Sequence, residues 1–119
     1  MIRAGAGVGR NIRNVMGRNA MFVKLYKYQI RRADLQKWEK INNAANKIYE
    51  HYGRVDFETL LRKEKYYIEV IELNRYASKN IFQKIIKEVD KDRRITKLYA
   101  SFLKLVYKNK ILEDEFETT

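Results

Sequence analysis

A chain of 119 residues, 45% of them apolar, has the length of one domain and can build a modest core. The lack of cysteine excludes disulfides, thiolate metal sites and a cysteine nucleophile. No run approaches the roughly 18 uncharged apolar residues needed to span a bilayer. The net charge of +11 is unevenly spread, since residues 1–32 hold eight basic residues and no acid. This asymmetry favours a basic arm that docks on protein, on an anionic membrane or on nucleic acid.

Residues 1–20 are rich in arginine and in small residues, so we expect a basic, irregular N-terminal arm. Its composition is typical of a mitochondrial targeting segment. A basic tail ordered only by a neighbouring molecule explains it equally well, and an amphipathic anchor giving peripheral membrane contact is a third interpretation. The arginines of the arm are Arg3, Arg10, Arg13 and Arg18.

Residues 21–52 repeat apolar side chains at threes and fours, which predicts one long helix or two helices with a bend near Asp34. Gly53 should end this helix and Asp56 should cap the next one. The repeating residues are Met21, Leu25, Tyr28, Leu35, Trp38, Ile41, Ala45, Ile48 and Tyr52.

The rest of the chain continues the helical period. Residues 57–89 predict two helices or one kinked helix, loosened at residues 78–80, and residues 90–93 predict a charged turn. Residues 95–106 predict an amphipathic helix, and residues 111–119 a loose, acidic C-terminal tail. Because no useful stretch alternates with period two, we expect an all-α fold. It should be a three- to four-helix bundle of long amphipathic helices, with residues 21–110 as the helical domain.

Catalytic groups are scarce in this sequence. His51 is the single histidine, and no second ligand stands at metal-binding spacing from it. Ser78 and Ser101 lie in no nucleophile motif. We therefore expect no catalytic residue, no metal and no enzymatic activity. Most of the nine tyrosines should be core residues rather than stacking platforms for bases, and the pairs to check for exposure are Tyr26 with Tyr28 and Tyr66 with Tyr67.

Residues 25–33, LYKYQIRRA, resemble the L-Y-R-x-x-L-R-x-A motif that opens the mitochondrial LYR family, and residues 56–63, DFETLLRK, are similar to the start of that family's third helix. The resemblance implies a helical matrix protein that docks an acyl carrier protein. The acyl-phosphopantetheine would belong to the carrier protein, and this chain would have no cofactor of its own. Lys27 stands where the family has arginine, which removes a planar bidentate donor. The implied partner-binding residues are Leu25, Tyr26, Lys27, Arg31 and Arg32.

Trp38, the run Asn43-Ala44-Ala45 and residues 71–75 are similar to bacterial-type large-subunit ribosomal protein twenty. The resemblance to the LYR family predicts a non-catalytic accessory or assembly subunit of a large mitochondrial complex, most simply a respiratory-chain complex. It would lie in the matrix or on the matrix side of the inner membrane. The alternative is a mitochondrial ribosomal protein whose basic arm binds rRNA phosphates.

Overall fold

The computed structural model describes residues 21–118. Within them the fold is α+β. The elements in chain order are β1 (Phe22–Arg31), the 3-10 turn η1 (Arg32–Asp34), α1 (Leu35–His51), β2 (Asp56–Lys63), β3 (Tyr67–Tyr76), α2 (Lys79–Lys91), α3 (Arg93–Leu103), the 3-10 turn η2 (Tyr107–Asn109) and β4 (Leu112–Glu117).

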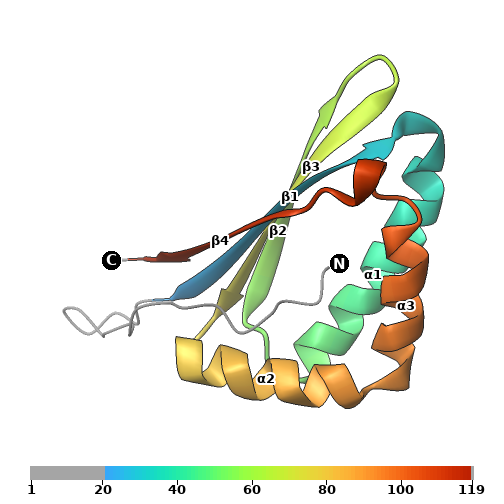
Figure 1. Cartoon of the computed structure of the whole chain (residues 1–119). Helices are drawn as coiled ribbons and strands as arrows, with labels where there is room; N and C mark the ends of the chain where they lie inside the picture. The colour runs from blue at the N-terminus through green and yellow to red at the C-terminus, as the bar shows by residue number, and fades with distance from the viewer. Residues whose placement is uncertain (1–20, 119) are drawn as a thin grey trace.

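The strands form one 4-stranded sheet in the order β2-β3-β1-β4, and every neighbouring pair is antiparallel. The helices lie on one side of this sheet, and the β2–β3 hairpin projects beyond them (Figure 1). We call the helix-covered side the inner face. On β1 it carries Phe22, Lys24, Tyr26, Tyr28 and Ile30, all of them buried. The opposite side, the outer face, carries no helix of the described chain.

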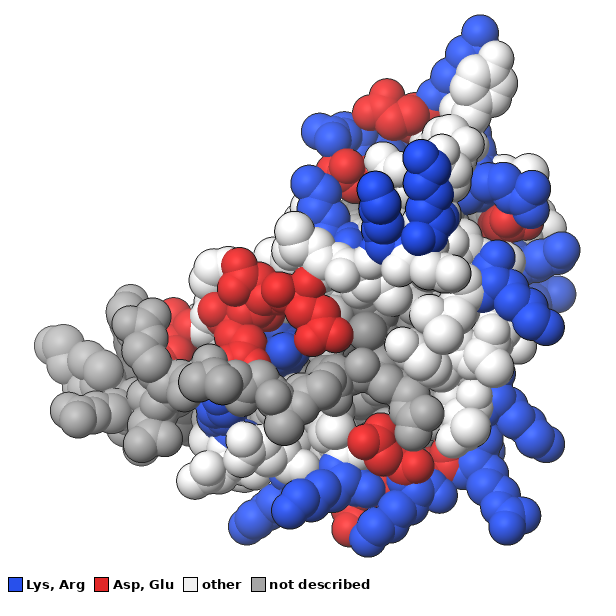
Figure 2. All heavy atoms as spheres, in the orientation of Figure 1, with Lys and Arg blue, Asp and Glu red and all other residues white. Residues whose placement is uncertain are grey.

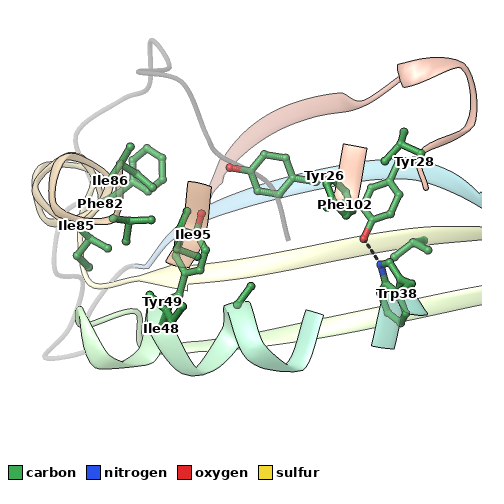
Figure 3. Packing of buried hydrophobic residues seen from close by; sticks show 14 of the residues in the cluster. Tyr26, Tyr28, Trp38, Ile48, Tyr49, Phe82, Ile85, Ile86, Ile95 and Phe102 are labelled. Atoms are coloured by element: carbon green, nitrogen blue, oxygen red, sulfur yellow. Dashed lines mark hydrogen bonds between the residues drawn. The ribbon is translucent and has the colours of Figure 1, made fainter. Parts of the chain in front are cut away.

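The hydrophobic core lies between the inner face and the helices (Figure 3). Phe102 of α3 is fully buried, and its ring meets that of Tyr28 edge-on with centroids 4.9 Å apart. Phe82 of α2 packs on Phe22 and Tyr76 at the other end, with centroid distances of 5.1 and 4.8 Å. These aromatic contacts join the helices to the two central strands.

The expectation of an all-α bundle is wrong. Residues 22–31, expected to open a long helix, form β1, and residues 56–76, expected to be helical, form the β2–β3 hairpin. The period-two pattern was obscured because the inner face of β1 includes a lysine, Lys24, while Val23 and Leu25 of the outer face are apolar. With apolar residues on both faces, a strand no longer alternates cleanly and matches a helical period by chance.

Several features predicted for the helical parts of the chain are present in the structure. The bend near Asp34 is the junction between β1 and α1, and Gly53, with φ of 109°, follows the end of α1 as a C′ glycine does. Ser78 caps α2 by accepting a hydrogen bond from Ile81 N at 3.1 Å. The amphipathic helix expected at residues 95–106 is present as α3. Asp56, expected to cap a helix, instead begins β2.

The acidic end of the chain is not loose. Leu112–Glu117 pairs with β1 along its length as β4. Thr118 continues the pairing, since its N–H donates to Met21 O at 3.0 Å and its Oγ1 accepts from Met21 N at 2.7 Å. The basic arm expected at residues 1–20, with its four arginines, lies outside the described residues.

Asp92 holds the corner between α2 and α3. Its carboxylate accepts hydrogen bonds from Arg94 N at 2.9 Å, from Arg94 Nη2 at 2.7 Å and from the Tyr52 hydroxyl at 2.8 Å. The Arg94 guanidinium and the Tyr52 hydroxyl hold the pKa of the Asp92 carboxyl well below its usual range. The carboxylate therefore ties the start of α3 to the end of α1.

Replacing Asp92 with asparagine should lower the melting temperature at pH 7. Because the folded-state pKa of Asp92 is depressed, its contribution is complete above the unfolded pKa of about 3.9 and is lost as the pH falls through the lower folded value. Thermal unfolding followed by circular dichroism should show a difference from the unsubstituted protein that narrows below about pH 4. The exposed Glu88→Gln on α2 is the control. A difference that stays constant from pH 7 to pH 3.5 would contradict the assignment.

Candidate ligand-binding site

Two neighbouring rows of residues make a polar band across the inner face of the sheet. The register pairs Lys24 of β1 with Asn74 of β3, and Tyr26 with Glu72. Lys24, Glu72 and Asn74 are all at most 6% exposed. The first row is Phe57, Asn74, Lys24 and Glu115, and the second is Thr59, Glu72, Tyr26 and Glu113. Buried charges lower stability unless they are paired, and the charges of this band have partners: Lys24 lies beside Glu115, and Glu72 accepts from the Tyr28 hydroxyl.

Arg54 reaches this band from the turn after α1. Its Nη1 donates to Asn74 Oδ1 at 2.8 Å and to Asn46 Oδ1 at 3.0 Å. The guanidinium carbon lies 4.5 Å from the ring centroid of Phe57 and 5.5 Å from that of Tyr49. Burial lowers the pKa of the Arg54 guanidinium, which nonetheless stays charged near neutral pH.

Two hydrogen-bond donors, one of this guanidinium and one beside it, have no partner in the described structure. Arg54 Nε and Asn46 Nδ2 are buried and make no hydrogen bond in the described structure. Both residues border a cavity of about 10 Å3, a volume that admits one water-sized group. The cavity is lined by Tyr26, Asn46, Tyr49, Arg54, Glu72, Asn74 and Tyr76. An acceptor oxygen placed there would satisfy donors whose burial otherwise costs about 1–3 kcal/mol each.

Three tyrosines give the cavity its aromatic walls. Burial raises the pKa of Tyr26, Tyr49 and Tyr76, so their hydroxyls stay protonated at neutral pH. A protonated phenol can donate to an oxygen acceptor. The cavity therefore offers the unpartnered donors of Arg54 and Asn46 within aromatic walls.

A chain of hydrogen bonds orients Glu72. The Trp38 indole N–H donates to the Tyr28 hydroxyl at 2.7 Å (Figure 3). This hydroxyl in turn donates to Glu72 Oε2 at 2.5 Å. Burial, followed by the charge of Glu72, raises the pKa of Tyr28, so the hydroxyl keeps its proton. Glu72 is thus held at the cavity wall by core residues of α1 and β1.

Lys24 joins the band to β4. Its ammonium lies 3.2 Å from Glu115 Oε1 and 3.6 Å from Glu113 Oε2, and the Lys24 side chain is 2% exposed. Lys79 at the start of α2 lies 3.6 Å from Glu115 Oε2. This network holds an edge strand whose sequence is mostly acidic.

The structure separates the residues expected to bind a partner on one helix face. Tyr26 lines the cavity, whereas Leu25, Lys27 and Arg31 belong to the outer face and Arg32 to η1. Their role in binding a partner stays a prediction. Sequence reasoning missed Asn46, Arg54, Glu72 and Asn74. No sequence signal marked them, because the alternate burial of β3 appears only in the folded sheet and its buried positions include Glu72 and Asn74.

His51 lies at the exposed end of α1, against the ring of Tyr52 at 5.3 Å. Among residues 21–118, no group of three or more His, Cys, Asp or Glu side chains is arranged to hold a metal ion. None of the described helices is long and apolar enough to cross a membrane.

No family model matches this chain, and no curated protein does. Solved structures share its fold. SnoaB, a cofactor-independent oxygenase from Streptomyces nogalater, has a TM-score of 0.64 at 8% identity, covering 81% of this chain and 90% of its own. A nipsnap family protein of unknown function from Agrobacterium tumefaciens scores 0.67 at 10% identity, with 85% and 90% covered. A dimeric ferredoxin-like protein from an uncultured marine organism scores 0.62 at 15% identity, with 85% and 89% covered.

These likenesses establish a ferredoxin-like α+β fold. They overturn the identification with the LYR family and the accessory-subunit and respiratory-chain roles drawn from it, and likewise the alternative of a ribosomal protein. The motif failed because residues 25–33 form a strand and a 3-10 turn, not a helix. The mitochondrial location, the acyl carrier protein and its acyl-phosphopantetheine stay predictions.

Proposed function

We propose that this protein binds a small aromatic molecule carrying an anionic or carbonyl oxygen, between the helices and the inner face of the sheet. The observation that carries the proposal is the pair of buried donors, Arg54 Nε and Asn46 Nδ2, at an aromatic-lined cavity. Ligand sites of this kind combine apolar walls with a few placed polar groups.

The cavity can enlarge on the side of β2. Phe57, whose ring covers the Arg54 guanidinium, is 38% exposed, and Leu61 on the same strand is 39% exposed. Exposed side chains change rotamer on the picosecond-to-nanosecond timescale. Rotation of Phe57 would open a path to the guanidinium without disturbing the central strands. A ligand ring would then replace the Phe57 ring on Arg54.

Asparagine 46 offers a sharp test of the site. Asn46→Asp keeps the acceptor oxygen that Arg54 Nη1 uses and replaces the unpartnered Nδ2 donor with a carboxylate oxygen. With salicylate as the probe in isothermal titration calorimetry, the variant should bind at least about tenfold more weakly, because a charge-assisted contact becomes repulsive. The fold should survive, since the new carboxylate pairs with Arg54.

Asn43→Asp is the matched control, because it adds the same charge to an exposed position of the same helix. It should bind salicylate as the unsubstituted protein does. Failure of the unsubstituted protein to bind salicylate, benzoate and phenol would contradict the proposal, and so would equal binding by the Asn46→Asp and Asn43→Asp variants.

The absence of catalysis stays part of this proposal. The cavity lining includes one carboxylate, Glu72, which accepts a hydrogen bond from the Tyr28 hydroxyl. One solved neighbour is an oxygenase that needs no cofactor, so oxygen uptake is the assay to apply. Uptake in the presence of a bound phenol, abolished by Glu72→Gln, would replace the binding role with an enzymatic one.

We also propose that a second copy of this chain covers the outer face. Leu25 and Leu73 are paired at its centre, flanked by the exposed Leu60 and Phe116. Charges of both signs border this apolar area, including Arg75 bonded to Asp56 and Glu58. A face with apolar centre and mixed rim is self-complementary across a twofold axis, and one solved neighbour is described as dimeric.

A further inference from the structure

The end of the sheet from which the β2–β3 hairpin projects carries two grooves. One groove of about 460 Å3 is lined by Arg31, Arg32, Ala33, Lys65, Tyr66 and Tyr67. The other, of about 680 Å3, lies along the linker between α3 and β4 and includes Lys27, Tyr107, Lys108 and Lys110. We call the two together the tyrosine–lysine end. It is separate from the cavity beside Arg54, with which it shares no lining residue.

Tyrosine rings form the walls of both grooves. The rings of Tyr67 and Tyr107 pack with centroids 4.6 Å apart, so this pair stands between the grooves. Tyr66 at the hairpin tip is 67% exposed. Of the two tyrosine pairs to be checked for exposure, Tyr26 and Tyr28 are core residues, whereas Tyr66 is open to solvent. A flat ring at such a position is available for stacking.

The charge of these grooves is almost entirely positive. Their described lining holds six basic side chains and one carboxylate, Glu69. Glu69 is already bound by Arg62 at 2.9 Å and by Lys27 at 3.4 Å. In the described part of the chain, no carboxylate lies within 4 Å of Lys65, Lys108 or Lys110. Basic side chains stand out around the hairpin, whereas acidic ones gather over β4 (Figure 2).

Two of these lysines, Lys65 and Lys108, lie beside tyrosine rings. Lys65 Nζ is 5.3 Å from the Tyr66 ring centroid, and Lys108 Nζ is 5.2 Å from that of Tyr107. Lys108 and Asn109 have φ of 53° and 52°, a left-handed conformation that costs a side-chain-bearing residue about 1–2 kcal/mol. Strain of this kind in an ordered turn often marks a functional segment.

We propose that the tyrosine–lysine end binds single-stranded nucleic acid. Bases would stack on Tyr66 and on the Tyr67–Tyr107 pair, and phosphates would contact Lys65, Lys108 and Lys110. Interleaved aromatic rings and cations in a groove are the arrangement that single-strand binders use. A membrane surface fits less well, because the aromatic residues line concave grooves and, among residues 21–118, none of the residues lining these grooves belongs to an α-helix.

The test is fluorescence anisotropy with a labelled twelve-nucleotide oligo(U) and the full chain at low salt. Lys65→Gln with Lys108→Gln should weaken binding about tenfold and reduce the salt dependence, and Tyr66→Leu should weaken it about fivefold or more. The matched control is Lys37→Gln with Lys47→Gln, which removes equal charge from exposed positions of α1.

The control variant should bind oligo(U) as the unsubstituted chain does. It has the same net charge as the groove lysine variant, so a difference between the two reports the groove contacts and not the net charge. Equal loss in the control and the groove variants would overturn the proposal. So would binding to phosphatidylserine vesicles with no binding to oligo(U), which would assign these grooves to lipid headgroups instead.

Discussion

Replacing Leu73 with aspartate should convert the protein from a dimer to a monomer. Leu73 is paired with Leu25 at the centre of the outer face, so a twofold interface would bury two new carboxylates against apolar side chains. Burying unpaired charge costs at least about 3 kcal/mol, which weakens association about 100-fold. Size-exclusion chromatography with light scattering should report the dimer mass for the unsubstituted protein and the monomer mass for the variant.

Ile81→Asp is the control for this experiment. Ile81 is an exposed apolar residue on α2, 39% accessible and on the helical side of the molecule. Its substitution adds the same charge far from the outer face and should leave the dimer intact. A monomeric unsubstituted protein, or a Leu73→Asp variant that still dimerises, would show that the outer face is not the interface.

Replacing Lys24 with glutamate should destabilise the protein by about 3–5 kcal/mol, the cost of breaking a buried ion pair and leaving uncompensated charge. The side chain is 2% exposed and lies between Glu113 and Glu115. Glutamate there would place a third carboxylate within the cluster and repel β4 from β1. Urea denaturation at pH 7 measures the loss, and proteolysis near residue 112 should accelerate as β4 detaches.

Lys27→Glu provides the comparison, because it makes the same change on the same strand. Lys27 points to the outer face and its side chain is 44% exposed, so losing its pair with Glu69 should cost at most about 1 kcal/mol. On a helix, residues 24 and 27 would share one face and the two substitutions would behave alike. Similar losses at both positions would contradict the strand register of β1.

The residues of the candidate site could be found only in part from the sequence. Tyr26 was singled out, but as a helix-surface residue beside Lys27 and Arg31, whereas it lines the cavity and they do not. Asn46 and Asn74 are 28 positions apart and meet through Arg54. Such a meeting depends on the pairing of β1 with β3 and on the crossing of α1 over them. A local sequence pattern cannot predict this contact, because its residues are far apart along the chain.

The sequence by itself determined the properties that depend on near neighbours along the chain. These are the uneven charge, the amphipathic stretch that became α3, the glycine that follows α1 and the break before α2. Tertiary structure decided whether residues 22–31 and 67–76 would be strand or helix. Both periods fit a stretch with apolar residues on two faces. Cross-strand hydrogen bonding, together with burial of inner-face residues such as Phe22, Ile30 and Ile68, selects the strand.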